Sequence, residues 1–211
     1  MAGEQIEQAS LTPHGLAHDR LYAFESAEAP AGMLRVTGAQ RRELLRYGAR
    51  LDPSGKVRVL TPQGRDVPVD GPGLPGPAFT LTHQPTPQTD VRPLSLISLE
   101  TIAELSRELG QRLDPRRFRA NFYLTLPAGP FAEDAFVGRT LRLGPIATIL
   151  VRERDPRCRF ITYDPAAPHV AEPLFALMKV LDRKHGGRAG VYASVVTPGV
   201  VSEGDSVTEM P

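Results

Sequence analysis

Glycine and proline interrupt this chain so often that long helices and long strands have little room to form. The 211 residues include 19 glycines and 21 prolines, and both residue types mark turns and the ends of elements. The densest stretch, residues 68–93, is interpreted as an inter-domain connection anchored by Phe79 and Leu81. We therefore expect two parts: a small N-terminal subdomain with its Pro/Gly-rich connection over 1–88, and a larger domain over 89–209.

The N-terminal part contains short apolar alternations of the kind found in strands. Two of them, over 21–24 and 57–60, predict strands. A polar amphipathic segment over 38–47 predicts a short helix, and the proline and glycine within 53–56 predict a turn. These elements predict a small β subdomain.

The larger part is more regularly patterned, with two apolar stripes of helical period. The stripe over 98–109 has Ser98 as its N-cap and a glycine as its stop. The stripe over 173–185 begins near a proline and also ends at a glycine. The expected strands are 94–97, 121–126, 141–143, 146–151, 190–196 and 200–207, with a break at 144–145, a turn at 203–205 and a frayed tail at 208–211. This pattern predicts a β-rich α+β fold with a barrel-like sheet and two or more helices.

Charge and cysteine content limit the compartments and the partners that can be expected for this protein. The net charge is +1, and the single cysteine, Cys158, excludes an internal disulfide and a cysteine-built zinc cluster. No apolar run is long enough to span a membrane and no signal peptide is visible, so we expect a cytoplasmic protein. The balanced charge argues against nucleic acid as a stable partner. The five histidines are scattered and no nucleotide-binding motif occurs.

Cys158 is the first candidate for chemistry, because four arginines lie within eight residues of sequence around it, at 152, 154, 157 and 159. Nearby guanidinium groups favour the thiolate form. A thiolate can be a nucleophile, a persulfide carrier or a soft metal ligand. The alternative is that Cys158 packs as a small buried hydrophobe.

A second candidate is the basic segment that precedes the strand expected over 121–126. On a strand, Arg117, Arg119 and Asn121 would point the same way and could grip a phosphate or a polar heterocycle. The alternative is a solvated basic turn. A third candidate is the helix entry with Ser95 and Ser98, where free N–H groups could bind an anion, although Ser98 could equally be only a cap.

The order of these features resembles the MOSC family, named for the C-terminal domain of molybdenum cofactor sulfurase. The matching residues are Leu96-Ile97-Ser98-Leu99, Arg117-Phe118-Arg119-Ala120-Asn121, residues 137–144, Arg157-Cys158, Asp164-Pro165, residues 190–193, Gly199 and residues 204–207. Residues 12–20 and 60–64 are similar to parts of the β-barrel domain that precedes MOSC domains. The resemblance therefore implies a barrel-like MOSC domain behind a shortened N-terminal one.

The resemblance also implies a cofactor and the residues that hold it. The cofactor is the molybdenum cofactor (molybdopterin), with Arg119 and Asn121 against the pterin and Cys158 as the molybdenum ligand or a sulfur carrier. Ser98, Arg117 and Arg157 are further candidates for cofactor binding. The lysine of the family's Tyr-Pro-Val-Lys-Ser-like motif has no counterpart in this chain. Either Arg20, or one of the arginines at 41 and 42, replaces it, or cofactor binding is weak or lost.

Three functions remain open at this point. The first is a molybdenum-dependent oxidoreductase that reduces N-hydroxylated small molecules and draws electrons from an external reductase, because the chain has no cysteine set for an iron–sulfur cluster. The second is a sulfur carrier that receives a persulfide on Cys158 from a separate desulfurase; pyridoxal phosphate is not expected in this chain. The third is a non-catalytic MOSC binding module; a Cys158 sealed in the core, with Arg119 paired to an internal carboxylate, would indicate it.

Overall fold

The structure is a computed structural model that describes residues 2–25, 35–36, 38, 41–69, 74, 80–83, 91–169 and 171–211. The chain divides into two compact units, and each is described by itself. The first comprises residues 1–5, 20–88 and 165–172, and the second comprises 6–19, 89–164 and 173–211. Phe79, the expected anchor of the connection, lies outside the described residues.

The first unit contains two three-stranded antiparallel sheets, in the orders β4-β3-β8 and β5-β6-β7. The strands are β3 (Tyr22–Glu25), β4 (Arg35–Val36), β5 (Gly48–Leu51), β6 (Val57–Leu60), β7 (Asp66–Pro68) and β8 (Thr80–His83). The strands expected over 21–24 and 57–60 are confirmed as β3 and β6, and the turn between β5 and β6 is closed by bonds to the Asp52 carboxylate. The small β subdomain follows from these pairings.

Two expectations for the first unit are corrected. The helix expected over 38–47 is a 3-10 helix, η1 (Arg42–Arg46). Its buried leucines, Leu44 and Leu45, are adjacent rather than three or four residues apart, so they supply no stripe for a longer α-helix. The connection at 68–93 also contributes β8, which pairs with β3.

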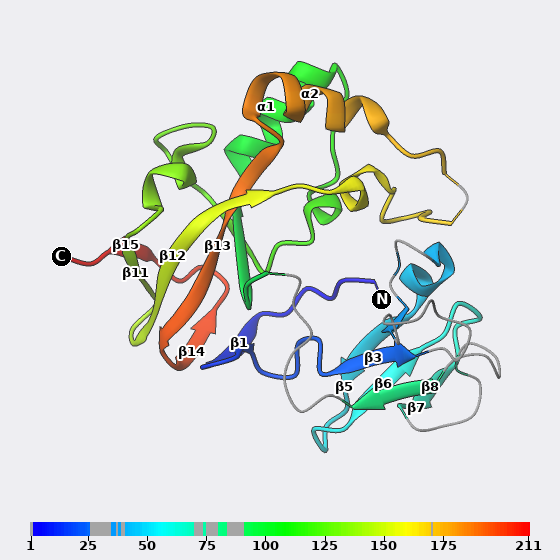
Figure 1. Ribbon diagram of the computed structural model, residues 1–211. Helices are drawn as coiled ribbons and strands as arrows, with labels where there is room; N and C mark the ends of the chain where they lie inside the picture. The colour runs from blue at the N-terminus through cyan, green and yellow to red at the C-terminus, as the bar shows by residue number, and fades with distance from the viewer. Residues whose placement is uncertain are drawn as a thin grey trace. The chain divides into compact units, whose positions relative to one another are not determined.

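The second unit is built on a six-stranded sheet in the order β10-β9-β13-β12-β11-β15 (Figure 1). Its strands are β9 (Leu94–Ser98), β10 (Phe122–Leu124), β11 (Thr140–Leu143), β12 (Ala147–Pro156), β13 (Arg188–Thr197) and β15 (Val207–Glu209); a small sheet adds β14 (Gly199–Ser202), β1 (Gln8–Thr12) and β2 (Gly15–Leu16). The long β12–β13 pair has three register shifts. Such bulges bend a strand and increase its twist, and the sheet accordingly curls into half a barrel.

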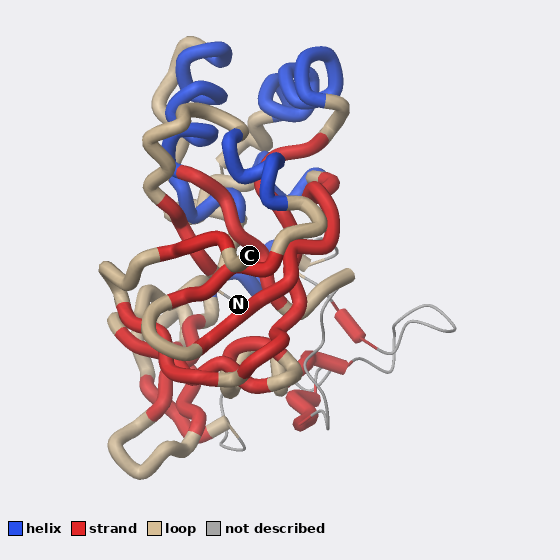
Figure 2. The backbone as a smooth tube through the Cα atoms, turned by 90° about the vertical axis from the view of Figure 1, so that its left-hand side faces the viewer, coloured by secondary structure: helices blue, strands red, loops and turns tan. Residues whose placement is uncertain are grey.

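Two α-helices, α1 (Leu99–Leu109) and α2 (Phe175–His185), confirm the helices expected in this unit. Ser98 caps α1 by accepting from the N–H of Thr101, and the left-handed Gly110 and Gly186 end the two helices. Figure 2 shows most of the helical segments gathered beyond one end of the long strands. With short strands dominating, the β-rich α+β class is confirmed.

The core of the second unit has two parts that share β9. Leu94 and Leu96 join the cluster on the inner face of the sheet, whereas Ile97 points to the cluster beneath the helices, because successive side chains alternate along a strand. The helical cluster includes Leu105, Phe118, Ile161, Leu177 and Leu181. All the residues of β9 are buried, so this strand fixes where the segments at both of its faces lie.

Two further expectations for the second unit are corrected. The strand expected over 121–126 is shorter, as β10, and runs parallel to β9. The tail over 208–211 is not frayed: β15 pairs with β11, and the N–H of Met210 donates to the carbonyl of Thr140 at 2.9 Å. The Gly144-Pro145 break falls, as expected, between the antiparallel strands β11 and β12.

Helices α1 and α2 are joined by a carboxylate whose ionisation should make stability depend on pH. Glu108 lies 2.8 Å from His185 Nε2 and 3.1 Å from Lys184 Nζ. Burial raises the pKa of Glu108, but the bonds from His185 and Lys184 outweigh it and hold that pKa below its ordinary 4.5. The stabilisation is therefore present above pH 4.5 and is lost as the pH falls through the depressed pKa. We expect Glu108→Gln to lower the free energy of unfolding by about 1 kcal/mol at pH 7.

The control for this prediction lies one turn earlier on the same helix. Glu104 pairs with Arg107, whose side chain is 72% exposed, so Glu104→Gln should change stability by less than about 0.5 kcal/mol. Urea unfolding at pH 7 and at pH 3 measures both variants. A Glu108→Gln deficit that stays constant down to pH 3 would contradict the role of the ionised carboxylate.

Candidate functional site

Cys158 lies just beyond the end of β12, where it is the N-cap residue of a 3-10 helix, η4 (Arg159–Thr162). Its side chain is exposed. Backbone hydrogen bonds fix the chain here. The N–H of Arg157 donates to the carbonyl of Gly187 at 2.9 Å, and the carbonyl of Cys158 accepts from the N–H of Ile161. The thiol is therefore exposed to solvent on a backbone fixed by hydrogen bonds. A binding module was expected to have this thiol buried in the core.

Arg157, the residue before Cys158, turns its side chain into the protein. Its guanidinium donates to the carbonyls of Ala189 at 2.8 Å and Phe118 at 3.0 Å. It also pairs with the buried Asp155 at 2.8 Å and lies over the Phe118 ring. With only 8% of the side chain exposed, Arg157 supports the loop from inside.

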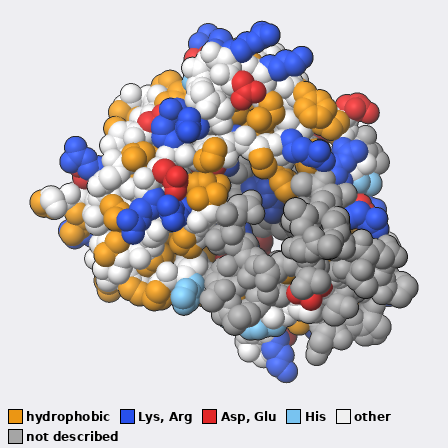
Figure 3. All heavy atoms as spheres, viewed as in Figure 1, with side chains coloured by type: hydrophobic (Ala, Val, Ile, Leu, Met, Phe, Trp, Pro, Cys, Tyr) orange, Lys and Arg blue, Asp and Glu red, His pale blue; other side chains and the backbone are white. Residues whose placement is uncertain are grey.

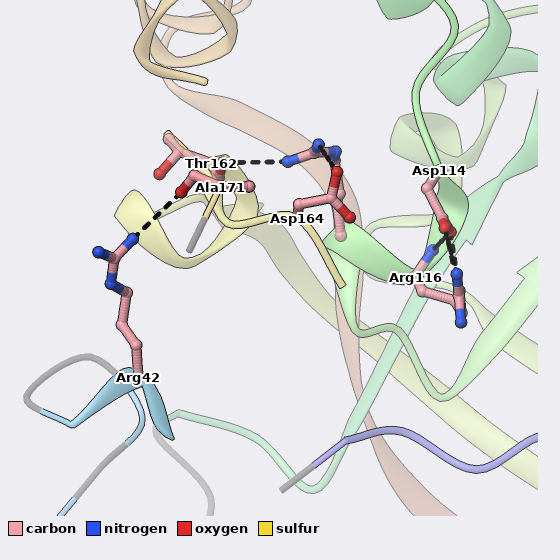
Figure 4. A network of polar contacts seen from close by, with 7 residues as sticks. Arg42, Asp114, Arg116, Thr162, Asp164 and Ala171 are labelled. Atoms are coloured by element: carbon pink, nitrogen blue, oxygen red, sulfur yellow. Dashed lines mark hydrogen bonds and ion pairs between the residues drawn. The ribbon is translucent and has the colours of Figure 1, made fainter. Parts of the chain in front are cut away.

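Arg117 also faces inward, from the 3-10 helix η2 (Pro115–Phe118). Its guanidinium donates to the carbonyl of Thr162 at 3.0 Å and contacts the Asp164 carboxylate at 3.3 Å (Figure 4). The expectation that Arg117, Arg119 and Asn121 share one face of a strand is therefore wrong. Asp114 caps η2 by accepting from the N–H of Arg116, and the proline that follows favours a helical first turn.

Arg119 ends η2 in the left-handed conformation, with φ of 51°. It is exposed, and its guanidinium carbon lies 5.8 Å from the centre of the Phe160 ring, two residues beyond Cys158. The charge of Arg119 also acts on the phenol of Tyr123: burial raises the pKa of Tyr123, whereas the charges of Arg157 and Arg119 act to lower it. The structure therefore brings Arg119 to the helix that Cys158 begins.

Asn121 is engaged inside the protein. Its side-chain oxygen accepts from the N–H and the hydroxyl of Ser95, at 3.0 and 3.2 Å, and its NH₂ group donates to Asp19 at 3.2 Å. Asp19 stands between His18 and Arg20, two non-glycine residues with positive φ. The amide thus joins β9 to a strained loop that is distant in sequence.

Ser98 is fully buried, and the anion at the start of α1 belongs to the protein itself. Glu133 accepts from the N–H of Ser98 at 3.1 Å and from the hydroxyl of Thr101 at 3.0 Å. The Glu133 side chain is 0% exposed, and it supplies the negative charge that a helix N-terminus favours. Sequence reasoning missed Glu133, because nothing in its neighbourhood marks it as buried. Ser98 thus acts as a cap.

Arg20, Arg41 and Arg42 belong to the first unit, whereas Cys158 belongs to the second. Arg20 has φ of 54°, and Arg42 donates to the carbonyl of Ala171, also of the first unit, at 3.4 Å (Figure 4). Their part in holding a cofactor stays a prediction.

Two other observations bear on the partners. No helix in the described part of the chain has both the length and the apolar character needed to cross a membrane. The Lys and Arg side chains of the described residues are dispersed over the face shown in Figure 3 and form no single basic patch there.

Fold and site together define a class of protein: a curled, β-rich domain that presents a thiol where a long strand gives way to a 3-10 helix. The chain belongs to the MOSC domain family, whose profile matches residues 83–208. That family is associated with the molybdenum cofactor.

Two solved structures were compared with this chain, and the first agrees with its fold. YuaD from Bacillus subtilis aligns over 97% of this chain and 85% of its own, with a TM-score of 0.52 and 15% identity. YiiM from Geobacillus stearothermophilus aligns over 92% of this chain and 75% of its own, with a TM-score of 0.45 and 15% identity. A search of curated proteins gives no significant match. At this identity the YuaD structure shows the fold alone.

Proposed function

We propose that this protein binds the molybdenum cofactor with the Cys158 thiolate as a ligand to molybdenum, and reduces N-hydroxylated small molecules. The observation that carries the proposal is the position of Cys158. The resemblance in motif order implies that Cys158, the one cysteine of the chain, corresponds to the family's cysteine. Its side chain is exposed at a fixed point of the backbone. A lone cysteine kept only for packing is more commonly buried.

The residues present fit such a group. Among the described residues no cluster of three or more His, Cys, Asp or Glu side chains could hold a metal ion. A cofactor that brings its own sulfur ligands needs only a soft donor from the protein, and a thiolate is one. Arg119, exposed near the start of η4, can pair with a phosphate or pterin oxygen.

The cofactor, when bound, supplies two-electron redox chemistry, while the chain supplies ligand, charge and orientation. The net reaction converts R–NHOH, two electrons and two protons into R–NH₂ and water. Both electrons come from an external reductase, since a single cysteine cannot hold an iron–sulfur cluster. Cys158 holds the metal side of the cofactor, and Arg119 neutralises its anionic side.

The test is metal and pterin analysis of protein purified from a host supplied with molybdate. We expect stoichiometric molybdenum and a fluorescent pterin oxidation product from the wild type, and loss of most of the molybdenum in Cys158→Ser. Arg116→Gln is the control, because Arg116 is exposed and pairs with Asp114, and it should retain the metal. A wild type free of both molybdenum and pterin would overturn the proposal.

The exposure of the thiol also favours a second candidate, a sulfur carrier, because a donor protein must reach the cysteine. A persulfide forms when the Cys158 thiolate attacks the terminal sulfur of a desulfurase persulfide and releases the donor thiolate. Alkylation trapping and mass spectrometry would then find one added sulfur atom on wild type and none on Cys158→Ala. A molybdenum-free protein that carries this sulfur would select the second candidate.

A further inference from the structure

Two arginine side chains link the short helices η2 and η4 next to Cys158 through hydrogen bonds to backbone carbonyls. Arg117 extends from η2 and donates to the carbonyl of Thr162, the last residue of η4. Arg157, two residues before η4, donates to the carbonyl of Phe118, the last residue of η2. We call these two side chains and their carbonyl partners the cross-brace. η2 therefore holds the C-terminal end of η4, and the segment that leads into η4 holds the C-terminal end of η2.

The cross-brace is shielded from water. The side chains of Arg117 and Arg157 are 12% and 8% exposed, and the Phe118 ring beneath Arg157 is 1% exposed. Hydrogen bonds from a charged donor are stronger than neutral ones, and more so where water is excluded. Each guanidinium also binds at several points: Arg157 holds the carbonyls of Phe118 and Ala189 together with Asp155. Lysine is a single point charge and cannot make this set of contacts.

The cross-brace acts one residue from each proposed site residue. Arg119 directly follows Phe118, whose carbonyl Arg157 binds, and Cys158 directly follows Arg157. Arg119 has φ of 51°, a conformation that persists in a non-glycine residue only where its surroundings impose it. Its guanidinium lies by the Phe160 ring of η4. The two contacts thus determine the separation between the end of η2 and the start of η4.

We propose that Arg157 and Arg117 are positioning residues that hold the charge of Arg119 beside the Cys158 thiol. This assigns them a role other than direct contact with a cofactor. The inference rests on the proposed function only in taking Cys158 and Arg119 as the site residues. It concerns the protein without any ligand, so it can be tested on cofactor-free material.

The test compares the alkylation rates of Cys158 by iodoacetate and by iodoacetamide. In both reactions the thiolate displaces iodide and forms a thioether, so the fraction of thiolate cancels in the ratio of the two rates. The iodoacetate anion is favoured by a positive charge near the sulfur. We expect Arg119→Gln to lower the ratio about threefold at low salt. Arg157→Lys and Arg117→Lys should each lower it to a similar extent, although both keep a positive charge.

Two comparisons separate positioning from general damage. Adding Arg157→Lys to Arg119→Gln should lower the ratio no further, because the charge to be positioned is already gone. Arg116→Gln removes a neighbouring charge of η2 that is paired with Asp114, and should leave the ratio near that of wild type. If Arg157→Lys fails to fold, Arg117→Lys, at the more exposed end of the cross-brace, carries the test.

A merely structural role would lower the thermal midpoint of the lysine variants and leave their reagent ratio at the wild-type value, and that result would overturn the inference. An Arg119→Gln protein with an unchanged ratio would overturn it as well. Neither result depends on molybdenum. A metal-free wild type with the expected ratios would therefore contradict the proposed function while the positioning role stands.

Discussion

Gly190→Ala should lower the free energy of unfolding by roughly 3 kcal/mol, because one added methyl group meets two obstacles at once. Gly190 lies in β13 with φ of 78°, which is unfavourable for any residue with a Cβ. An added Cβ would also lie 2.5 Å from the Leu96 carbonyl oxygen and 3.1 Å from Ile97 Cβ. Both neighbours belong to the fully buried β9, so neither can move without disturbing the core.

Gly204→Ala is the matched control. Gly204 has φ of 85°, but no heavy atom lies within 4 Å of its added Cβ, so only the backbone cost of about 1 kcal/mol applies. Equilibrium unfolding in urea measures both variants, and unchanged m-values would show that the same cooperative transition is compared. Equal losses in the two variants would mean that the close approach of β13 to β9 contributes nothing.

The parts of this fold that could be predicted from sequence depend on local chemistry. Ser98 and the glycines at 110 and 186 end their helices through bonds and backbone conformations within one turn. The hairpin break at Gly144 is equally local. The same reasoning could have reached η2, because Asp114 followed by proline is an N-cap signal.

The parts that could not be predicted depend on partners distant in sequence. Asn121 bonds with Asp19 across 102 residues and with Ser95 across 26. Glu133 was missed, because its burial comes from the helix entry that it meets in space. Four arginines around Cys158 are indistinguishable by residue type. Contact with Phe118 separates the inward Arg157 from Arg159, which donates to the Tyr163 hydroxyl.

Asp155→Ala should cost about 3–5 kcal/mol of unfolding free energy, because it leaves the charge of Arg157 buried without its carboxylate. Asp155 is 1% exposed and lies 2.8 Å from Arg157 Nη1. Replacing the partner as well, with Arg157→Met, removes the orphaned charge, so the double variant should lose less than the sum of the single changes. Chemical denaturation of the three variants gives this coupling.

The carboxylate of the control pair lies on the same strand. Glu153, two residues earlier on β12, pairs with Arg92 at 2.9 Å, with both side chains more than 40% exposed. Water screens that pair, so Glu153→Ala should cost less than about 1 kcal/mol. An Asp155→Ala variant no less stable than Glu153→Ala would show that Arg157 reaches water once its carboxylate is removed. A much larger loss of stability in Asp155→Ala than in Glu153→Ala would mean that the fold keeps the charge of Arg157, the residue before Cys158, buried. Positioning by Arg157 requires this.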